Sequence, residues 1–200
     1  MTARCGLVLL TGGRGERLGG PKHDRAHPLG GSWGGHLVRV FRAVVPDGPV
    51  CVLGAALPEH PELPRLDDPR EGPAVALRTW AASAPPPARR WWILACDQIA
   101  WTERAFSGWI SEAESADPEG EAWAFVVRDG HRQPLGGFLG GALVAPLALG
   151  HSTHLQAVLD QLPSSPLSGA TWKGGDIDTP DDLAAFGLSA SSPSVHPARP

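Results

Sequence analysis

Residues 6–22 read Gly6-Leu-Val-Leu-Leu10-Thr11-Gly-Gly-Arg-Gly-Glu-Arg-Leu-Gly-Gly-Pro-Lys22, a short apolar run followed directly by a glycine-rich loop. The run has the length and composition of a buried β-strand. Five glycines within nine residues let backbone N–H groups approach a polyphosphate closely, and Arg14, Arg17 and Lys22 add positive charge. The stretch therefore predicts a strand that ends in an anion-binding loop.

Two common phosphate-binding motifs do not fit this loop. A P-loop requires lysine directly after its second glycine, but Pro21 follows Gly20. The dinucleotide-binding fingerprint requires a third glycine where Leu18 stands. Two interpretations of the loop alone stay open, a polyphosphate site and a flexible loop that carries scattered basic residues.

Apolar patterns along the rest of the chain alternate between strand and helix. Short apolar runs predict strands at 49–53, 91–96 and 122–127. Apolar residues at helical spacing predict helices at 36–45, 73–82, 101–113, 155–162 and 182–188. The stretch 134–143 is ambiguous because its glycines interrupt any period. This order indicates βαβ units and hence an α/β fold with a mostly parallel sheet.

The predicted topology gathers distant residues at one edge of the sheet. Ligands of such sheets bind at the carboxyl ends of the strands. Residues 11–22, residues 53–55 and Asp97 are therefore expected to be neighbours. One domain is expected over residues 1–188, and the Ser/Pro-rich tail at 189–200 is expected to be disordered.

Composition and charge exclude several classes of function. A net charge of −4 gives no reason to expect a nucleic acid or an anionic membrane as partner, because both favour a basic surface. The apolar runs are shorter than the roughly 20 residues of a membrane span, and the N-terminus has no secretory signal. Three cysteines (Cys5, Cys51 and Cys96) form no CxxC pair, so neither zinc nor disulfides are expected. These features predict a cytoplasmic protein.

The glycine-rich loop also carries the pattern of a known family. Gly12-Gly13, Arg17, Gly19 and Lys22 resemble the GGxxxRxGxxK signature of the MobA-like nucleotidyltransferases. Four further stretches are similar to the family's other motifs and follow in the same order: Asp67 or Asp68 with Gly72-Pro73-Ala74, Leu94-Ala-Cys-Asp97, Gln133-Pro134-Leu135, and Asp176-Ile-Asp178-Thr-Pro-Asp-Asp-Leu183. Five motifs in order are far more specific than any one of them.

The resemblance implies a fold and an activity. The fold is a Rossmann-like three-layer α/β/α sandwich of the nucleotide-diphospho-sugar transferase type. The activity is Mg²⁺-dependent nucleotidyl transfer. The motifs are most similar to those of molybdenum cofactor guanylyltransferases, which transfer GMP from GTP to molybdopterin and release pyrophosphate. The implied partners are GTP or another NTP, a molybdopterin-type acceptor and proteins of molybdoenzyme maturation.

The resemblance also assigns residues to the nucleotide. The N–H groups of Gly12 and Gly13 hold the triphosphate, and Thr11 belongs to the same binding loop. Arg17 and Lys22 offset the charge that grows on the phosphates during transfer, which makes them catalytic. Asp67 or Asp68 meets the base or the ribose, with the backbone of Leu10 and Leu53 nearby.

A metal site and an acceptor side complete the implied set. Asp97 holds Mg²⁺, which prefers oxygen ligands, and Asp178 or Asp176 supplies the second carboxylate. Gln133 faces the acceptor. Simpler roles are open: Asp97 as a residue of the turn after a strand, Gln133 as a cap of a turn, and residues 179–182 as the start of a helix.

The chain departs from the family at three places. Thr11 stands where alanine is usual, and Gln98-Ile99 follows Asp97 where the family commonly has x-Pro. Residues 23–35 replace the short apolar stretch that is usual in the family. Together with the next residue they contain three histidines, His23, His27 and His36. Solvated loop positions are a simpler interpretation of these histidines than a metal site. The base therefore stays open, with CTP or another phosphorylated acceptor as an alternative. A catalytically silent nucleotide-binding protein of cofactor maturation is another.

Overall fold

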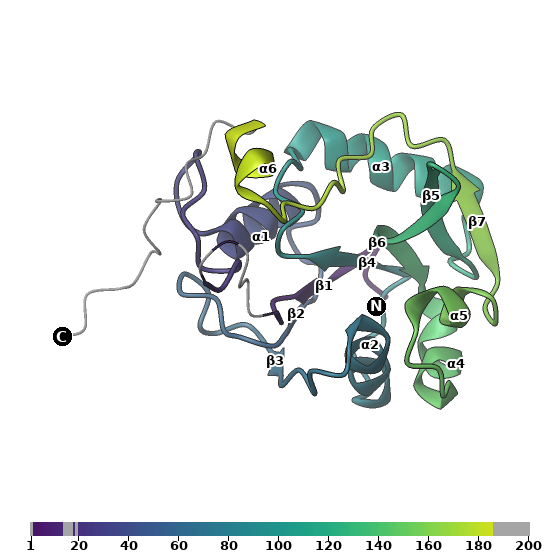
Figure 1. Ribbon diagram of the computed structural model, residues 1–200. Coiled ribbons are helices and arrows are strands. Elements are labelled where there is room, and N and C mark those ends of the chain that lie inside the picture. Colours follow the sequence, from purple (N-terminus) through teal and green to yellow (C-terminus); the bar gives the residue numbers. More distant parts are fainter. Residues whose placement is uncertain (1, 14–17, 19, 186–200) are drawn as a thin grey trace.

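A seven-stranded sheet crosses the computed structural model, which describes residues 2–13, 18 and 20–185, in the order β3-β2-β1-β4-β6-β5-β7 (Figure 1). The strands are β1 (Gly6–Leu10), β2 (Val50–Leu53), β3 (Arg65–Leu66), β4 (Arg90–Ala95), β5 (Trp123–Arg128), β6 (His131–Gly140) and β7 (Ser164–Leu167). Only β6 runs against its neighbours β4 and β5 among the described strands, and the other pairs are parallel. The sheet is therefore mostly parallel, as the sequence predicts.

Helices cover both faces of the sheet. The helices are α1 (Trp33–Val44), α2 (Pro73–Ala82), α3 (Glu103–Ala116), the 3₁₀ turn η2 (Gly141–Leu143), α4 (Val144–Leu149), α5 (Leu155–Leu159) and α6 (Pro180–Ala185). Helices α1 and α3 share one core cluster with one face of the sheet, whereas α2, α4 and α5 share a second cluster with the other face. The three-layer α/β/α sandwich is thereby confirmed.

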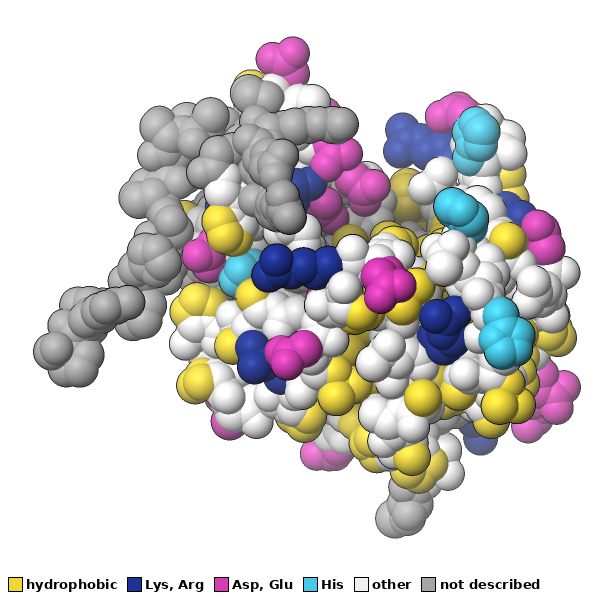
Figure 2. Space-filling view, turned by 60° about the horizontal axis from the view of Figure 1, so that its bottom comes forward, with side chains coloured by type: hydrophobic (Ala, Val, Ile, Leu, Met, Phe, Trp, Pro, Cys, Tyr) yellow, Lys and Arg dark blue, Asp and Glu magenta, His cyan; other side chains and the backbone are white. Residues whose placement is uncertain are grey.

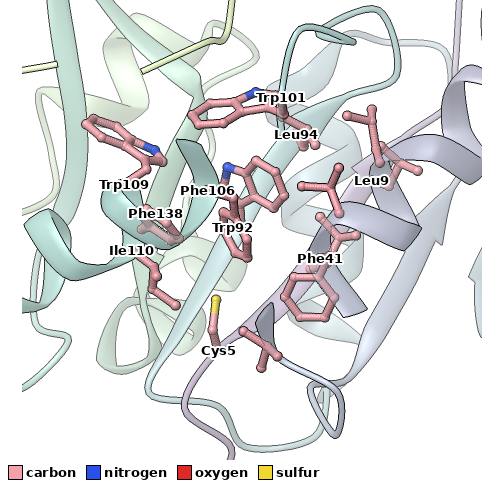
Figure 3. Close-up of a cluster of buried hydrophobic side chains, with 14 of the residues drawn as sticks. Cys5, Leu9, Phe41, Trp92, Leu94, Trp101, Phe106, Trp109, Ile110 and Phe138 are labelled. Atoms are coloured by element: carbon pink, nitrogen blue, oxygen red, sulfur yellow. The ribbon is translucent and has the colours of Figure 1, made fainter. Parts of the chain in front are cut away.

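Aromatic side chains fill the core beside the central strand β4. Seven tryptophans of the described residues are almost completely buried. Trp92 of β4 stacks on Phe106 of α3 with 4.1 Å between ring centroids, and Trp101 meets Trp92 edge-on at 5.1 Å (Figure 3). Trp92 precedes the turn at 96–100 and Trp101 follows it. Their packing therefore holds the two ends of the turn that contains Asp97.

Most predicted elements are present with shifted ends. Helix α1 begins three residues earlier than predicted because the Ser32 hydroxyl accepts a hydrogen bond from the Gly35 amide at 3.0 Å and caps the helix. The ambiguous stretch is strand β6. Gly137 and Gly140 lie where a neighbouring backbone leaves no room, since a Cβ on Gly137 would lie 2.5 Å from the Ala124 carbonyl, and Gly136 has φ of +82°.

Three short elements were not predicted. Strand β7 at the sheet edge contains Pro166, a residue that is tolerated in edge strands but argues against a strand in a sequence. Strand β3 has two residues and helix α4 has six, and both are too short to give a clear periodic pattern. No helix among the described residues is long and apolar enough to cross a membrane. The expected disordered tail and the end of the last predicted helix lie outside the described residues.

Candidate active site

A cleft of about 1050 Å³ opens at the carboxyl ends of β1, β2 and β4. Its volume lies near the upper end of the roughly 300–1,000 Å³ that is usual for ligand pockets. Leu10 to Gly13 form one wall, Asp67 and Asp68 belong to another, and Asp97 closes the end. Most residues that the sequence assigned to a nucleotide therefore share one cavity.

Thr11 ties the start of the loop to the end of β2. Its amide donates to the Leu53 carbonyl at 2.8 Å, and its hydroxyl donates to the carbonyls of Ala55 at 2.8 Å and Leu53 at 3.1 Å. Gly54 has φ of +117°, and a Cβ there would lie 2.8 Å from the Gly12 nitrogen. Alanine would lack this hydroxyl, so the departure at Thr11 adds a contact. Leu53 contributes its carbonyl and keeps its side chain in the core.

Asp68 lies against the glycine-rich loop. A Cβ on Gly12 would lie 1.8 Å from the Asp68 carboxylate, whose other oxygen accepts from the Arg70 amide at 2.8 Å. Asp67 points outward, with 88% of its side chain exposed and 3.4 Å to Arg65. Of the two candidate aspartates, Asp68 is therefore the one that lies against the backbone of the glycine-rich loop.

Lys22 joins the end of β4 to the C-terminal segment. Its Nζ donates to Asp97 at 2.8 Å and to Asp178 at 2.5 Å. Burial alone lowers the pKa of Lys22, but the hydrogen bonds to Asp178 and Asp97 outweigh it and leave the pKa above its ordinary value. The ammonium therefore stays charged and holds two carboxylates together that belong to distant parts of the chain.

These carboxylates fit a hard divalent cation. One oxygen of Asp97 is buried and has no hydrogen-bond partner, and a cationic group, the Lys22 ammonium, already lies between Asp97 and Asp178. Within the described residues no three His, Cys, Asp or Glu side chains are grouped as metal ligands. A Mg²⁺ ion, however, commonly takes one or two carboxylates and completes its shell with phosphates and water.

Asp176 is close to this pair, and its pKa is raised. Its surroundings disfavour ionisation, first by desolvation and then by the Asp97 carboxylate, and raise its pKa to about 6 although part of the side chain is accessible. Only Asp178 contacts the Lys22 ammonium among these two. Asp178 is thus the better placed second carboxylate.

The helix-start interpretation of residues 179–182 also has structural support. The Asp182 carboxylate accepts from the amides of Thr179 at 2.8 Å and Asp178 at 3.1 Å, and the Thr179 hydroxyl accepts from the Asp182 amide at 3.2 Å. This reciprocal cap begins α6 and fixes the backbone of Asp178. Its side chain remains directed at Lys22, so both roles coexist.

The three histidines are packed into the molecule, which corrects their interpretation as solvated. His23, His27 and His36 are each at most 9% exposed. The rings of His27 and His36 stack with 3.7 Å between centroids, and His36 Nε2 lies 2.9 Å from the Trp101 carbonyl. The Glu59 carboxylate accepts from the amide and hydroxyl of Ser32 and fastens the same segment. Residues 23–32 therefore form a packed support for α1.

The remaining predicted residues lie less close to the cavity or outside the description. Arg17 lies outside the described residues. Gln133 is near the tip of the β5–β6 hairpin, where its amide makes a 3.5 Å contact with the His131 carbonyl, while Leu135 lines the cleft. Arg65 and Arg70 line the cleft and were missed. Arg65 begins the two-residue strand β3 and Arg70 lies in the loop after it, and so short a strand leaves no pattern in the sequence.

Charge on the outer surface is mixed. Figure 2 shows Lys and Arg side chains interspersed with Asp and Glu on the face displayed, with no patch of a single sign covering it. This face therefore offers no general positive field that would attract a polyanionic ligand.

The fold and these groups define the class of the protein. A mostly parallel sheet with a glycine-rich loop after β1 and an aspartate after β4 is the architecture of an α/β nucleotidyltransferase. The chain belongs to the family of the MobA-like NTP transferase domain, whose model matches residues 7–166. Among curated protein sequences, none matches significantly.

Solved structures of similar fold come from several organisms. Rv0371c from Mycobacterium tuberculosis H37Rv has 18% identity and a TM-score of 0.67, over 92% of this chain and 98% of that chain. Molybdopterin-guanine dinucleotide biosynthesis protein A from Archaeoglobus fulgidus has 16% identity and a TM-score of 0.66, over 90% and 95%. Rv0371c in complex with manganese has 17% identity and a TM-score of 0.61, over 93% and 98%. At these identities the likeness shows the fold alone.

Proposed function

We propose that the protein transfers GMP from GTP to the terminal phosphate of a molybdopterin-type acceptor, with Mg²⁺ as its metal. The observation that carries this proposal is the Lys22 ammonium between Asp97 and Asp178, 2.8 and 2.5 Å away, beside the glycine-rich loop. Nucleotidyl transfer needs a cationic side chain near the triphosphate and carboxylates that hold the metal beside it. The similarity to the A. fulgidus protein supports the base and the acceptor.

The reaction exchanges one phosphoanhydride bond for another. An oxygen of the acceptor phosphate forms a bond to the α-phosphorus of GTP. The bond from that phosphorus to the bridging oxygen breaks, and pyrophosphate leaves with the electron pair. The N–H groups of Gly12 and Gly13 hold the triphosphate in line, and Lys22 and Arg17 neutralise the charge that grows on the leaving group.

Asp97 and Asp178 would hold the metal. Bound Mg²⁺ supplies positive charge to the phosphates. When the site is loaded, the Lys22 ammonium turns from the carboxylates toward the triphosphate, which its flexible four-carbon stem permits. Asp68, or its neighbour Asp67, meets the base or ribose, and Gln133 borders the acceptor side of the cleft.

Pyrophosphate release tests the proposal. The assay contains Mg²⁺, molybdopterin and each of the four NTPs in turn, with wild type and Asp97→Asn. We expect pyrophosphate release with GTP. This release should require molybdopterin and should be lost in Asp97→Asn. An absence of release with all four NTPs, while nucleotide binding persists, would show that the protein is not this transferase and would favour a nucleotide-binding role in cofactor maturation.

A second candidate uses CTP or another phosphorylated acceptor. It is favoured by the form of the C-terminal motif, Asp176-Ile-Asp178, where the guanylyl enzymes that the motifs resemble carry asparagines. Release with CTP in place of GTP would select it and leave the roles of Asp97 and Lys22 unchanged.

We further propose that one domain spans residues 1–188 and works in the cytoplasm. Three free cysteines, two of them buried, suit a reducing compartment. A chain ending at residue 188 is expected to melt at the same temperature as the full chain and to bind GTP equally well.

A further inference from the structure

Gln98 is a buried glutamine directly after Asp97. Only 2% of it is exposed, and it stands where the resembled family commonly has another residue followed by proline. Its side-chain amide donates to the Gly174 carbonyl at 2.7 Å, and its side-chain oxygen accepts from the Ala95 amide at 3.4 Å. One side chain thus connects the end of β4 to the segment 172–178.

Two further contacts join the same segment to the same turn. The Ile177 amide donates to the Asp97 carbonyl at 3.3 Å. The Ile177 side chain is completely buried in a small cluster with Ile99, Leu18 and Trp33. The turn 97–99 therefore holds the segment through a side-chain hydrogen bond, a backbone hydrogen bond and an apolar contact.

The segment needs such attachments because it has little rigidity of its own. It lies between β7 and α6 and forms no helix or strand. Gly174 and Gly175 stand next to each other just before Asp176, and paired glycines give a backbone wide conformational freedom. The Gln98 hydrogen bond ends on one of them, the Gly174 carbonyl. Its loss would free the backbone that leads to Asp178.

We propose that Gln98 is a positioning residue, which sets the segment 172–178 so that the Asp178 carboxylate faces Asp97. The inference rests on the proposed function insofar as Asp178 serves a metal. In this chain the segment is held by the Gln98 side-chain amide and by Ile99, which stands where the family commonly has proline. Groups that orient a metal ligand typically change metal affinity by about 10–100-fold when removed.

Hydrogen exchange tests the positioning without any ligand. Gln98→Met keeps the size of the side chain and removes its polar groups, whereas Gln98→Glu keeps an acceptor for Ala95 and loses the donor to Gly174. Both variants are expected to speed exchange of the Ile177 amide, while the amides of β4, such as that of Ile93, exchange as in wild type. Unchanged exchange of Ile177 in both variants would overturn the proposal.

Mn²⁺ binding tests the consequence for the metal. Its affinity is measured by electron paramagnetic resonance with a non-hydrolysable GTP analogue, and nucleotide affinity is measured separately in EDTA. Gln98→Met is expected to bind Mn²⁺ about 10-fold or more weakly, with nucleotide affinity in EDTA unchanged. Gln98→Glu is used in the exchange measurement alone, because its added carboxylate next to Asp97 would itself attract the cation. Gln161→Met, at an exposed glutamine after α5, is the matched control and should bind as wild type does.

The two measurements separate failure of this inference from failure of the proposed function. Wild-type Mn²⁺ affinity in Gln98→Met, together with a loss in Asp97→Asn, would overturn the role of Gln98 and leave the proposed transferase activity unaffected. If the Gln98 variants exchange the Ile177 amide faster but the wild-type protein binds no Mn²⁺, the positioning role of Gln98 would be supported and the proposed metal-dependent reaction would be rejected.

Discussion

At the scale of single residues, Lys22 is the cation that connects the two acidic residues of the candidate site. Its single ammonium donates to two carboxylates that lie 75 and 156 residues away along the chain. Lysine suits this position because an ammonium on a flexible stem can exchange carboxylate partners for phosphate oxygens, which a planar guanidinium does less freely. A neutral side chain at this position would therefore affect the nucleotide and the cation in opposite directions.

Lys22→Met is expected to weaken GTP binding about 10–100-fold, because hydrogen bonds to charged groups contribute about 1.5–3 kcal/mol. The same variant should bind Mn²⁺ more tightly than wild type in the absence of nucleotide, since the ammonium no longer competes for Asp97 and Asp178. Isothermal titration calorimetry measures both affinities. Lys173→Met, at an exposed lysine, is the control. Equal GTP affinity in Lys22→Met and wild type would contradict the role of the ammonium.

Gly54→Ala tests the close approach of β2 to the loop. The backbone of Gly54 has φ of +117°, and the added Cβ would lie 2.8 Å from the Gly12 nitrogen, so alanine is both strained and crowded. The free energy of unfolding is expected to fall by about 1–3 kcal/mol in urea denaturation, with weaker GTP binding. Gly175→Ala, where a Cβ meets nothing within 4 Å, should leave stability near that of wild type. Equal stability of the two variants would refute the constraint.

At the scale of elements, residues 23–32 connect the lysine of the site to α1. This segment is packed through the stacked rings of His27 and His36, and Arg39 adds positive charge near both. Burial and the neighbouring His36 lower the pKa of His27 to about 4, and burial lowers that of His36. Acid therefore acts on the support of α1 before it reaches the core of the sheet.

The lowered pKa of His27 predicts acid sensitivity with a defined sign. Between about pH 6.5 and pH 4 the unfolded chain binds a proton at His27 and the folded chain does not, so stability is complete above pH 6.5 and declines as the pH falls. Urea denaturation at pH 7.5 and pH 5 should show a loss of about 2 kcal/mol from this residue, at about 1.4 kcal/mol per pH unit. His27→Gln should remove most of that difference and His151→Gln, at an exposed histidine, should not. A loss of stability between pH 7.5 and pH 5 that is as large in His27→Gln as in wild type would rule out this histidine as a source, whereas a smaller remaining loss is expected from His23 and His36, whose pKa values burial also lowers.

Elements with one dominant periodicity are predictable, and those shaped by neighbours are not. The run at β4 has a strand's length and composition, so both the strand and the aspartate after it follow from the sequence. Strand β6 does not, because its glycines are required by the approach of Ala124 and Gly120. The histidines look like loop residues because their burial depends on α1 and Trp101, which meet them only in the folded chain.

At the scale of the whole molecule, the candidate site is assembled from three distant parts of the chain. Motif order pointed to the glycine-rich loop, Asp97 and the C-terminal acidic stretch separately. The choice of Asp178 over Asp176, and the contact of Lys22 with both partners, depends on how the C-terminal segment returns across β4, which no local pattern encodes. A ligand that bridges these parts should therefore stabilise the entire fold.

Joint binding of nucleotide and metal is the corresponding prediction. A ligand that binds only the folded state at 100 times its Kd adds about 2.7 kcal/mol, which raises the melting temperature of a 200-residue protein by roughly 5–10 °C. GTP with Mg²⁺ should give a shift of this size, greater than the sum of the shifts with either alone, because in the proposed site Asp97 and Asp178 would bind the metal next to the phosphates in the loop. EDTA should reduce the shift to that of GTP alone, and Asp97→Asn should abolish the excess. Purely additive shifts would mean that nucleotide and cation bind at separate places, and a larger shift with CTP would assign the cleft to the cytidylyl reaction.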